Sequence, residues 1–66
     1  MSIRLNGETR PLAQPVALSD LLRQLGLDGH PVVVELNRRA LTASELGSCI
    51  VSPGDEVEIV RISAGG

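Results

Sequence analysis

The chain has 66 residues, room for one small domain with a small core. Eight acidic residues against six basic ones give a net charge of −2, which argues against a domain that binds nucleic-acid phosphates. A single cysteine excludes an internal disulfide, and no Cys and His residues have the spacing of zinc ligands, so no metal site is predicted. The sequence has neither a long apolar run nor a signal-peptide pattern. We therefore expect a small cytoplasmic protein that does not cross a membrane.

The first predicted elements are two paired strands. Ile3 and Leu5 alternate with polar residues, the period of a half-buried strand. The Asn-Gly dipeptide at 6–7 predicts a tight turn, because both residue types tolerate a positive φ. Residues 8–13 then form the return strand, at a sheet edge because Pro11 has no N–H group to donate. The domain is therefore expected to open with a β-hairpin.

A helix is predicted next, at about residues 18–26, because leucines form one apolar stripe at positions 18, 21, 22 and 25. Asp20 suits the first turn of a helix, and Gly26 suits its end. The N-cap is ambiguous from the sequence. Ala17 stands at the expected position but caps poorly, and capping by Ser19 would shorten the helix by two residues.

Short strands and turns are predicted for the second half of the chain. β-branched and aliphatic residues indicate strands at 32–36, 49–51 and 56–62, separated by turns at 28–31, 37–39 and 52–55 and by a short capped helical turn at 42–46. The order of the main elements is β-β-α-β-β. This order predicts an α+β fold in which one helix packs on one face of a small mixed sheet.

The last strand indicates which face of the sheet remains open. Val57 and Ile59 are expected to pack under the helix. The residues of the other strands expected on the same face are Ile3, Leu5, Val32 and Val34. The alternate residues of the strand point to the opposite face. Glutamates are ordinary there, but Val60 and Ile62 near the end of the chain are not, and we expect them to dock a partner.

The side chains that often carry catalysis are expected to be structural in this chain. His30 precedes a proline in a turn, and Cys49 is expected to be a small buried apolar residue. The chain has no lysine to act as a nucleophile or isopeptide acceptor, and no aromatic residue on which bases could stack. Asp55, Glu56 and Glu58 are interpreted as a solubilising surface that steers a basic partner. No catalytic residue and no metal site are predicted.

The C-terminus carries the strongest functional signal. Ala64, Gly65 and Gly66 follow the last strand almost directly. The last four residues, when extended, reach about 14 Å, and the two glycines can pass through a slot too narrow for side chains. The α-carboxyl group of Gly66 would then be the reactive group inside a neighbouring enzyme. From the residues alone, a frayed end remains the alternative interpretation.

The sequence resembles the ThiS family of sulfur carriers of thiamine biosynthesis. The resemblance rests on PGDEVEIV at 53–60, VELN at 34–37 and the AGG ending at 64–66, and it covers the whole chain. Ala17 and Leu46 depart from the family pattern, which often has Ser or Thr and an aromatic residue at these positions. The family has a ubiquitin-like β-grasp fold. The resemblance therefore implies one domain over 1–66, with 63–66 as a flexible functional tail.

The resemblance also implies a mechanism in which the chain is a recycled co-substrate and binds no cofactor itself. A ThiF-like, E1-like enzyme that uses ATP and magnesium would adenylate the Gly66 carboxylate. A persulfide donor such as a cysteine desulfurase would convert it to a thiocarboxylate, and a ThiG-like thiazole synthase would accept the sulfur. Gly65 and Ala64 would thread the tail into these enzymes, while Val60 and Ile62 dock.

Three other functions remain open at this point. The small subunit of molybdopterin synthase shares the fold and terminus, but it is usually longer and has aromatic residues near its tail. A protein modifier would be conjugated to lysines, and this chain has no lysine with which to form polymers. A non-enzymatic interaction or RNA-binding β-grasp module would function without Gly66, whereas each carrier would lose its activity.

Overall fold

Seven strands and two helices form among residues 1–63, the part of the chain that the computed structural model describes. In chain order these elements are β1 (Ser2–Leu5), β2 (Glu8–Pro11), β3 (Val16–Ala17), α1 (Leu18–Gln24), β4 (Val32–Leu36), β5 (Arg39–Ala40), α2 (Ala43–Leu46), β6 (Ile50–Val51) and β7 (Glu56–Arg61). The main elements β1, β2, α1, β4 and β7 follow the predicted β-β-α-β-β order.

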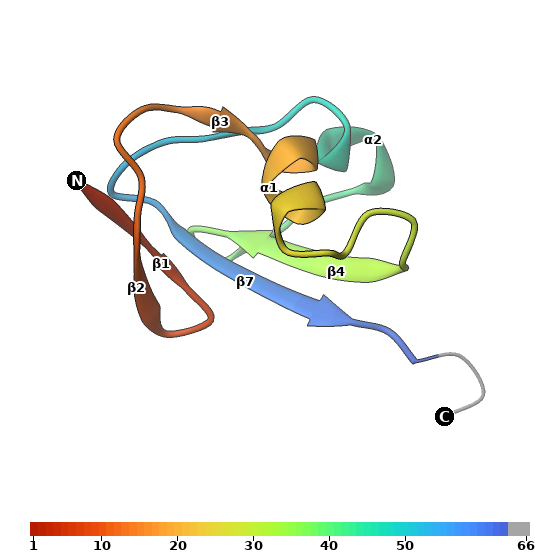
Figure 1. Ribbon diagram of the computed structural model, residues 1–66. Helices are drawn as coiled ribbons and strands as arrows, with labels where there is room; N and C mark the ends of the chain where they lie inside the picture. Colours follow the sequence, from red (N-terminus) through yellow and green to blue (C-terminus); the bar gives the residue numbers. More distant parts are fainter. Residues whose placement is uncertain (64–66) are drawn as a thin grey trace.

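The main sheet is mixed and has the strand order β2-β1-β7-β4-β5. In it β1 runs parallel to β7, and the other neighbouring strands are antiparallel. A second, two-stranded sheet joins β3 to β6. Helix α1 lies against one face of the main sheet, and α2 lies beside α1 (Figure 1). This arrangement confirms the predicted α+β class with one main helix on one face of a mixed sheet.

The N-terminal hairpin forms as predicted, except that its second strand ends at Pro11 rather than at residue 13. Asn6 and Gly7 have φ angles of 51° and 82°, the left-handed conformation that a tight hairpin turn requires at both central residues. Ser2 pairs with Pro11 across the two strands. Because β2 is the outermost strand of the sheet, the missing N–H group of Pro11 leaves no gap in the interior of the ladder.

Helix α1 begins where predicted, at Leu18, without a capping side chain. Ala17 occupies the N-cap position and makes no side-chain cap bond. The Leu18 N–H group donates to the Cys49 carbonyl over 2.9 Å, which continues the register of β3 and β6 by one residue. Ser19 lies inside the helix and is not its cap. The regular helix ends two residues earlier than predicted, and Gly26, with a φ of 74°, follows as the expected stop.

The core lies between α1 and the covered face of the sheet. It contains only aliphatic side chains, and no polar or charged residue among those described is buried. Leu5 and Val32 pack at its border as predicted, and Cys49 is half-buried against it. The buried residues are Ile3, Leu18, Leu21, Val34, Val51, Val57 and Ile59.

Two elements were not predicted, and both are two residues long. Strand β3 pairs with the predicted β6, and β5 returns along β4 after the turn at Asn37 and Arg38. Arg39, predicted to lie in that turn, is therefore the first residue of β5. A two-residue strand is too short to show a period in the sequence.

Helix α2 has the predicted capping box. The Glu45 N–H group donates to the Thr42 hydroxyl over 3.2 Å, and the Thr42 N–H group donates to the Glu45 carboxylate over 2.8 Å. These reciprocal bonds satisfy two N–H groups at the start of a helix only four residues long. No helix in the described part of the chain is long and apolar enough to cross a membrane.

Candidate functional site

The face of the main sheet opposite α1 carries the residues that were predicted to contact a partner. On this face β4 and β7 present cross-strand pairs, Val33 opposite Val60 and Glu35 opposite Glu58. We call this surface the open face; it comprises Val33, Glu35, Arg38, Glu56, Glu58, Val60 and Ile62. All but Ile62 line a shallow groove of about 370 Å³.

The open face is apolar where β7 ends. Val60 is 61% exposed, Ile62 48% and Val33 46%. The Ile62 N–H group donates to the Pro31 carbonyl over 2.9 Å, so the pairing with the neighbouring segment continues beyond the last residue of β7. The predicted exposure of Val60 and Ile62 is therefore observed. Val33 was not named in the predicted patch, although the inward positions predicted for Val32 and Val34 place it on this face.

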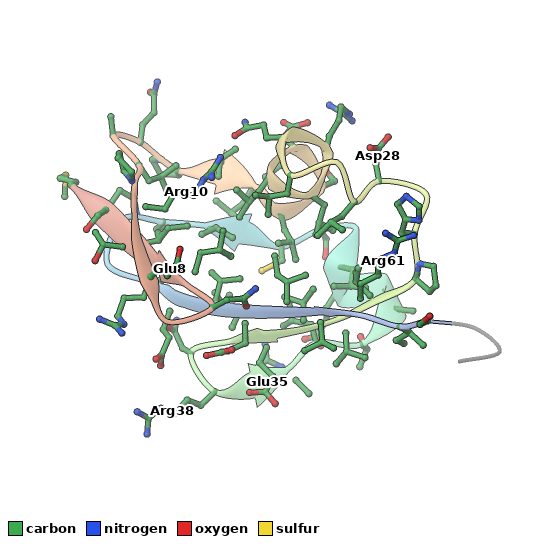
Figure 2. The ribbon with its side chains drawn as sticks, turned by 60° about the horizontal axis from the view of Figure 1, so that its bottom comes forward. Glu8, Arg10, Asp28, Glu35, Arg38 and Arg61 are labelled. Atoms are coloured by element: carbon green, nitrogen blue, oxygen red, sulfur yellow. The ribbon has the colours of Figure 1, made fainter. Side chains whose placement is uncertain are left out.

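The rest of the open face is acidic. Glu35 and Glu58 lie directly opposite each other, and neither forms an ion pair with any residue in 1–63. Like charges in this position oppose strand pairing slightly. Arg38 lies nearby and pairs with Glu56 at 3.4 Å, although its own side chain is almost fully exposed. Figure 2 places Glu35 and Arg38 on the side of the sheet away from α1.

Asp55, which the sequence grouped with these acids, has a structural role instead. One of its carboxylate oxygens accepts the Ser52 N–H group over 2.8 Å, and the other accepts the Asn37 side-chain amide over 3.2 Å. The Asn37 side-chain oxygen in turn accepts the Glu56 N–H group over 2.9 Å. These bonds tie the turn before β7 to the turn after β4. The predicted acidic cluster is therefore divided, and Glu56 and Glu58 belong to the open face.

Asn6 extends the pairing of β7 at the point where β1 ends. Its side-chain oxygen accepts the Ile59 N–H group over 2.7 Å, and its amide nitrogen donates to the Ile59 carbonyl over 3.2 Å. The Asn6 side chain thus bonds to Ile59 as the backbone of one further residue of β1 would. Asn6 was predicted only as part of the turn, because nothing in the local sequence pattern indicates a contact 53 residues away.

The remaining candidate residues do not assemble into a reactive site. His30 is exposed in its turn, as predicted, and the half-buried Cys49 donates a weak bond to the neighbouring Ile50 carbonyl. No group of three or more His, Cys, Asp or Glu side chains in residues 1–63 is arranged to hold a metal ion. Of the predicted tail at 63–66, Ser63 is exposed, and Ala64, Gly65 and Gly66 lie outside the described residues.

Comparison with known proteins decides between the functions left open by the sequence. A model of the ThiS family matches residues 3–66. The chain belongs to the ThiS family. It is thus a member of the sulfur carriers of thiamine biosynthesis.

Curated relatives and a solved structure agree with this membership. The sulfur carrier protein ThiS of Thermus thermophilus is 37% identical over 62 residues, which are 94% of this chain and 95% of that protein. A thiazole synthase of Paramagnetospirillum magneticum is 35% identical over 66 residues, and this chain spans only 20% of its length. The crystal structure of the thiamine biosynthesis protein ThiS from Geobacter metallireducens has a TM-score of 0.80 at 28% identity, with full coverage of both chains. The fold is therefore the β-grasp-like fold of ThiS proteins.

Proposed function

We propose that this ThiS-family chain carries sulfur as a thiocarboxylate on its last residue, Gly66. The observation that carries the proposal is the open face, whose apolar end coincides with the end of β7 and hence with the start of the tail. A partner that binds Val60 and Ile62 is held within reach of the C-terminal carboxylate, because the last four residues span at most about 14 Å. Membership of the ThiS family supports the same assignment.

The carboxylate requires activation, because its negative charge repels nucleophiles and its oxygen is a poor leaving group. In the first step a carboxylate oxygen of Gly66 attacks the α-phosphorus of ATP, and pyrophosphate leaves. A ThiF-like adenylating enzyme holds the ATP and magnesium for this step. The chain itself contributes the position of the carboxylate, which the docked face and the tail fix together.

Sulfur then replaces the adenylate. The terminal sulfur of a persulfide, supplied by a donor such as a cysteine desulfurase, attacks the acyl carbon and AMP leaves. A second thiol then attacks the cysteine sulfur of the donor and forms a disulfide with it, while the cleaved sulfur–sulfur bond leaves the thiocarboxylate on Gly66. The chain is consumed and regenerated in each cycle, so it acts as a co-substrate rather than as an enzyme.

A ThiG-like thiazole synthase is the proposed acceptor of the sulfur. A thiazole synthase containing a 66-residue segment 35% identical to this chain supports this choice. Joining a carrier and its acceptor in one chain raises the effective concentration of each at the other. This is an advantage only if the two bind each other during the reaction. Gly65 and Ala64 are proposed to occupy the narrow entrance of each partner's active site, because residues without side chains, or with small ones, fit there.

The proposal is tested by loading the chain in vitro with the adenylating enzyme, ATP, magnesium, cysteine and a desulfurase, followed by intact-mass measurement. The wild-type chain should gain the mass difference between one sulfur and one oxygen atom. Gly66→Ala should remain unmodified, because the added methyl group obstructs the narrow slot. Gly47→Ala is the matched control and should load normally, since Gly47 has a φ of −81° and its new methyl group would meet only ordinary contacts. Normal loading of Gly66→Ala would contradict the proposal.

A further inference from the structure

One edge of β7 is unpaired beside the open face. In an antiparallel ladder, the backbone groups of alternate residues point to opposite edges of a strand. The Ile62 N–H group bonds to the Pro31 carbonyl at 2.9 Å, and the Asn37 N–H group bonds to the Glu56 carbonyl at 2.7 Å. In the register of β4 and β7, the even-numbered residues of β7 therefore bond toward β4. The backbone groups of the odd-numbered residues, including Arg61, point toward the opposite edge.

The hairpin covers only the first part of that opposite edge. The Asn6 N–H group donates to the Val57 carbonyl over 2.9 Å, and the Asn6 side chain satisfies both backbone groups of Ile59. The chain turns back at Asn6 and Gly7, whereas β7 continues past this turn (Figure 1). The N–H and C=O groups of Arg61 consequently have no partner within residues 1–63.

We propose that residues 61–63, here called the β7 edge, accept an extended segment of the adenylating enzyme as an additional strand. This inference rests on the proposed function and deepens it by naming how the partner binds. Strand addition uses backbone hydrogen bonds for affinity and alternate side chains for specificity. Because the β7 edge leads directly into residues 64–66, such pairing would also set the direction in which the tail enters the enzyme.

The side chains beside the β7 edge define the chemistry of that segment. Arg61 belongs to the opposite face from Val60 and Ile62, and it forms no ion pair within residues 1–63. Figure 2 shows Arg61 on the same side of the sheet as Asp28, which is the side that carries α1. Side chains of a strand alternate between faces. The added segment should therefore present a carboxylate toward Arg61 and an aliphatic side chain toward Ile62.

A second copy of this chain fits the β7 edge less well than such a segment. Antiparallel pairing of two copies would place two Arg61 side chains near each other on one face. It would also join two open faces that both carry unpaired glutamates, Glu35 and Glu58. Like charges on neighbouring strands oppose pairing. The edge is also short, which limits uncontrolled strand pairing.

A pair of substitutions separates the backbone of Arg61 from its side chain. Arg61→Ala keeps the N–H group, whereas Arg61→Pro removes it at an edge position that proline tolerates. Affinity for the adenylating enzyme is measured by calorimetry without ATP. We expect Arg61→Pro to bind about tenfold more weakly than Arg61→Ala, which equals about 1.4 kcal/mol. Equal affinity of the two variants would overturn the inference.

Amide hydrogen exchange on the wild-type chain provides a test that does not depend on how the proline variant folds. The Arg61 and Ser63 amides should exchange rapidly in the free chain and slowly in the complex. The Thr9 amide should exchange rapidly in both states, because it points to the outer edge of β2. The bond from the Leu12 N–H group to Met1 fixes the register in which Glu8 and Arg10, and not Thr9, bond to β1. An unprotected Arg61 amide in the complex, or protection that appears at high chain concentration without the enzyme, would contradict the inference. A chain that loads sulfur normally with an unprotected edge leaves the proposed function intact, whereas a chain that never loads contradicts that function directly.

Discussion

At the scale of single residues, Asn6 is the clearest case of one side chain with two structural roles. It adopts a φ of 51° in the hairpin turn, and its amide group pairs with both backbone groups of Ile59. These bonds are partly buried, so water replaces them poorly when they are lost. Asn6 therefore stabilises both the hairpin and the part of β7 that leads to the tail.

Asn6→Ala should lower the free energy of unfolding by about 2 to 3 kcal/mol, because it removes both bonds and forces alanine into the left-handed region. Asn6→Gly is the matched control. It removes the same bonds without backbone strain and should recover about 1 kcal/mol of this loss. Urea denaturation measures both values. An Asn6→Ala variant within about 0.5 kcal/mol of the wild type would show that the contact with Ile59 is unimportant.

Glu45 links the stability of α2 to pH. The bond from the Thr42 N–H group, and then the bond from Arg39 at 3.0 Å, hold the pKa of the Glu45 carboxyl below its usual value of 4.5. A carboxylate with a lowered pKa stabilises the fold fully above its ordinary pKa. That contribution is lost as the pH falls through the lowered pKa, so α2 should loosen on acidification below the usual value of 4.5.

An NMR titration of the Glu45 side chain tests this dependence. The wild-type carboxyl should titrate below 4.5, and Arg39→Gln should raise its pKa part of the way back. Arg38→Gln is the control, because Arg38 pairs with Glu56 instead and should leave the titration of Glu45 unchanged. A Glu45 pKa that does not respond to Arg39→Gln would exclude the ion pair as a cause.

At the scale of elements, β4 and β7 carry the proposed docking surface because α1 covers only one face of the sheet (Figure 1). The exposed Val33, Val60 and Ile62 have no structural need for an apolar side chain. Their position at the end of β7 is the feature that associates them with the tail. Docking should therefore depend on this end of the open face rather than on exposed aliphatic residues in general.

Val60→Asp should weaken binding to the adenylating enzyme by at least about tenfold, or about 1.4 kcal/mol, because it places a charge in an apolar contact. Ile50→Asp is the control: Ile50 is 54% exposed, against 61% for Val60, but it lies on β6 in the other sheet. Neither change should lower the melting temperature appreciably. Equal affinities of the two variants would place the docking surface elsewhere.

The elements with a clear period were predictable, and the shorter ones were not. The leucine stripe predicted α1, and the Asn-Gly pair predicted the hairpin turn. In contrast, β3 and β5 consist of two residues each and depend on partners distant in the chain. The start of α1 was ambiguous for the same reason, since the bond to its first N–H group comes from Cys49, 31 positions after Leu18.

At the scale of the whole molecule, a small aliphatic core holds together the sheet that carries the open face and leads into the C-terminal tail. Val60 and Ile62 could be predicted for this surface because they are apolar residues that follow two glutamates on the same face of the strand. Val33 follows from the same alternation, because Val32 and Val34 were predicted to face the core. The unpaired edge at Arg61 could not be predicted, because it depends on where β1 ends in space. The AGG ending was visible in the sequence because it is short, terminal and almost directly after a strand.

In the proposed function the C-terminal carboxylate of Gly66 is the reactive group, and the folded domain presents it to the partner enzymes. The most direct test is the intact mass of the protein isolated from its own cells under non-reducing conditions. The proposed function predicts a species heavier by the difference between sulfur and oxygen, which disappears when Gly66 is deleted. Only the unmodified mass, even after the adenylating enzyme, ATP and a persulfide donor are supplied, would contradict it.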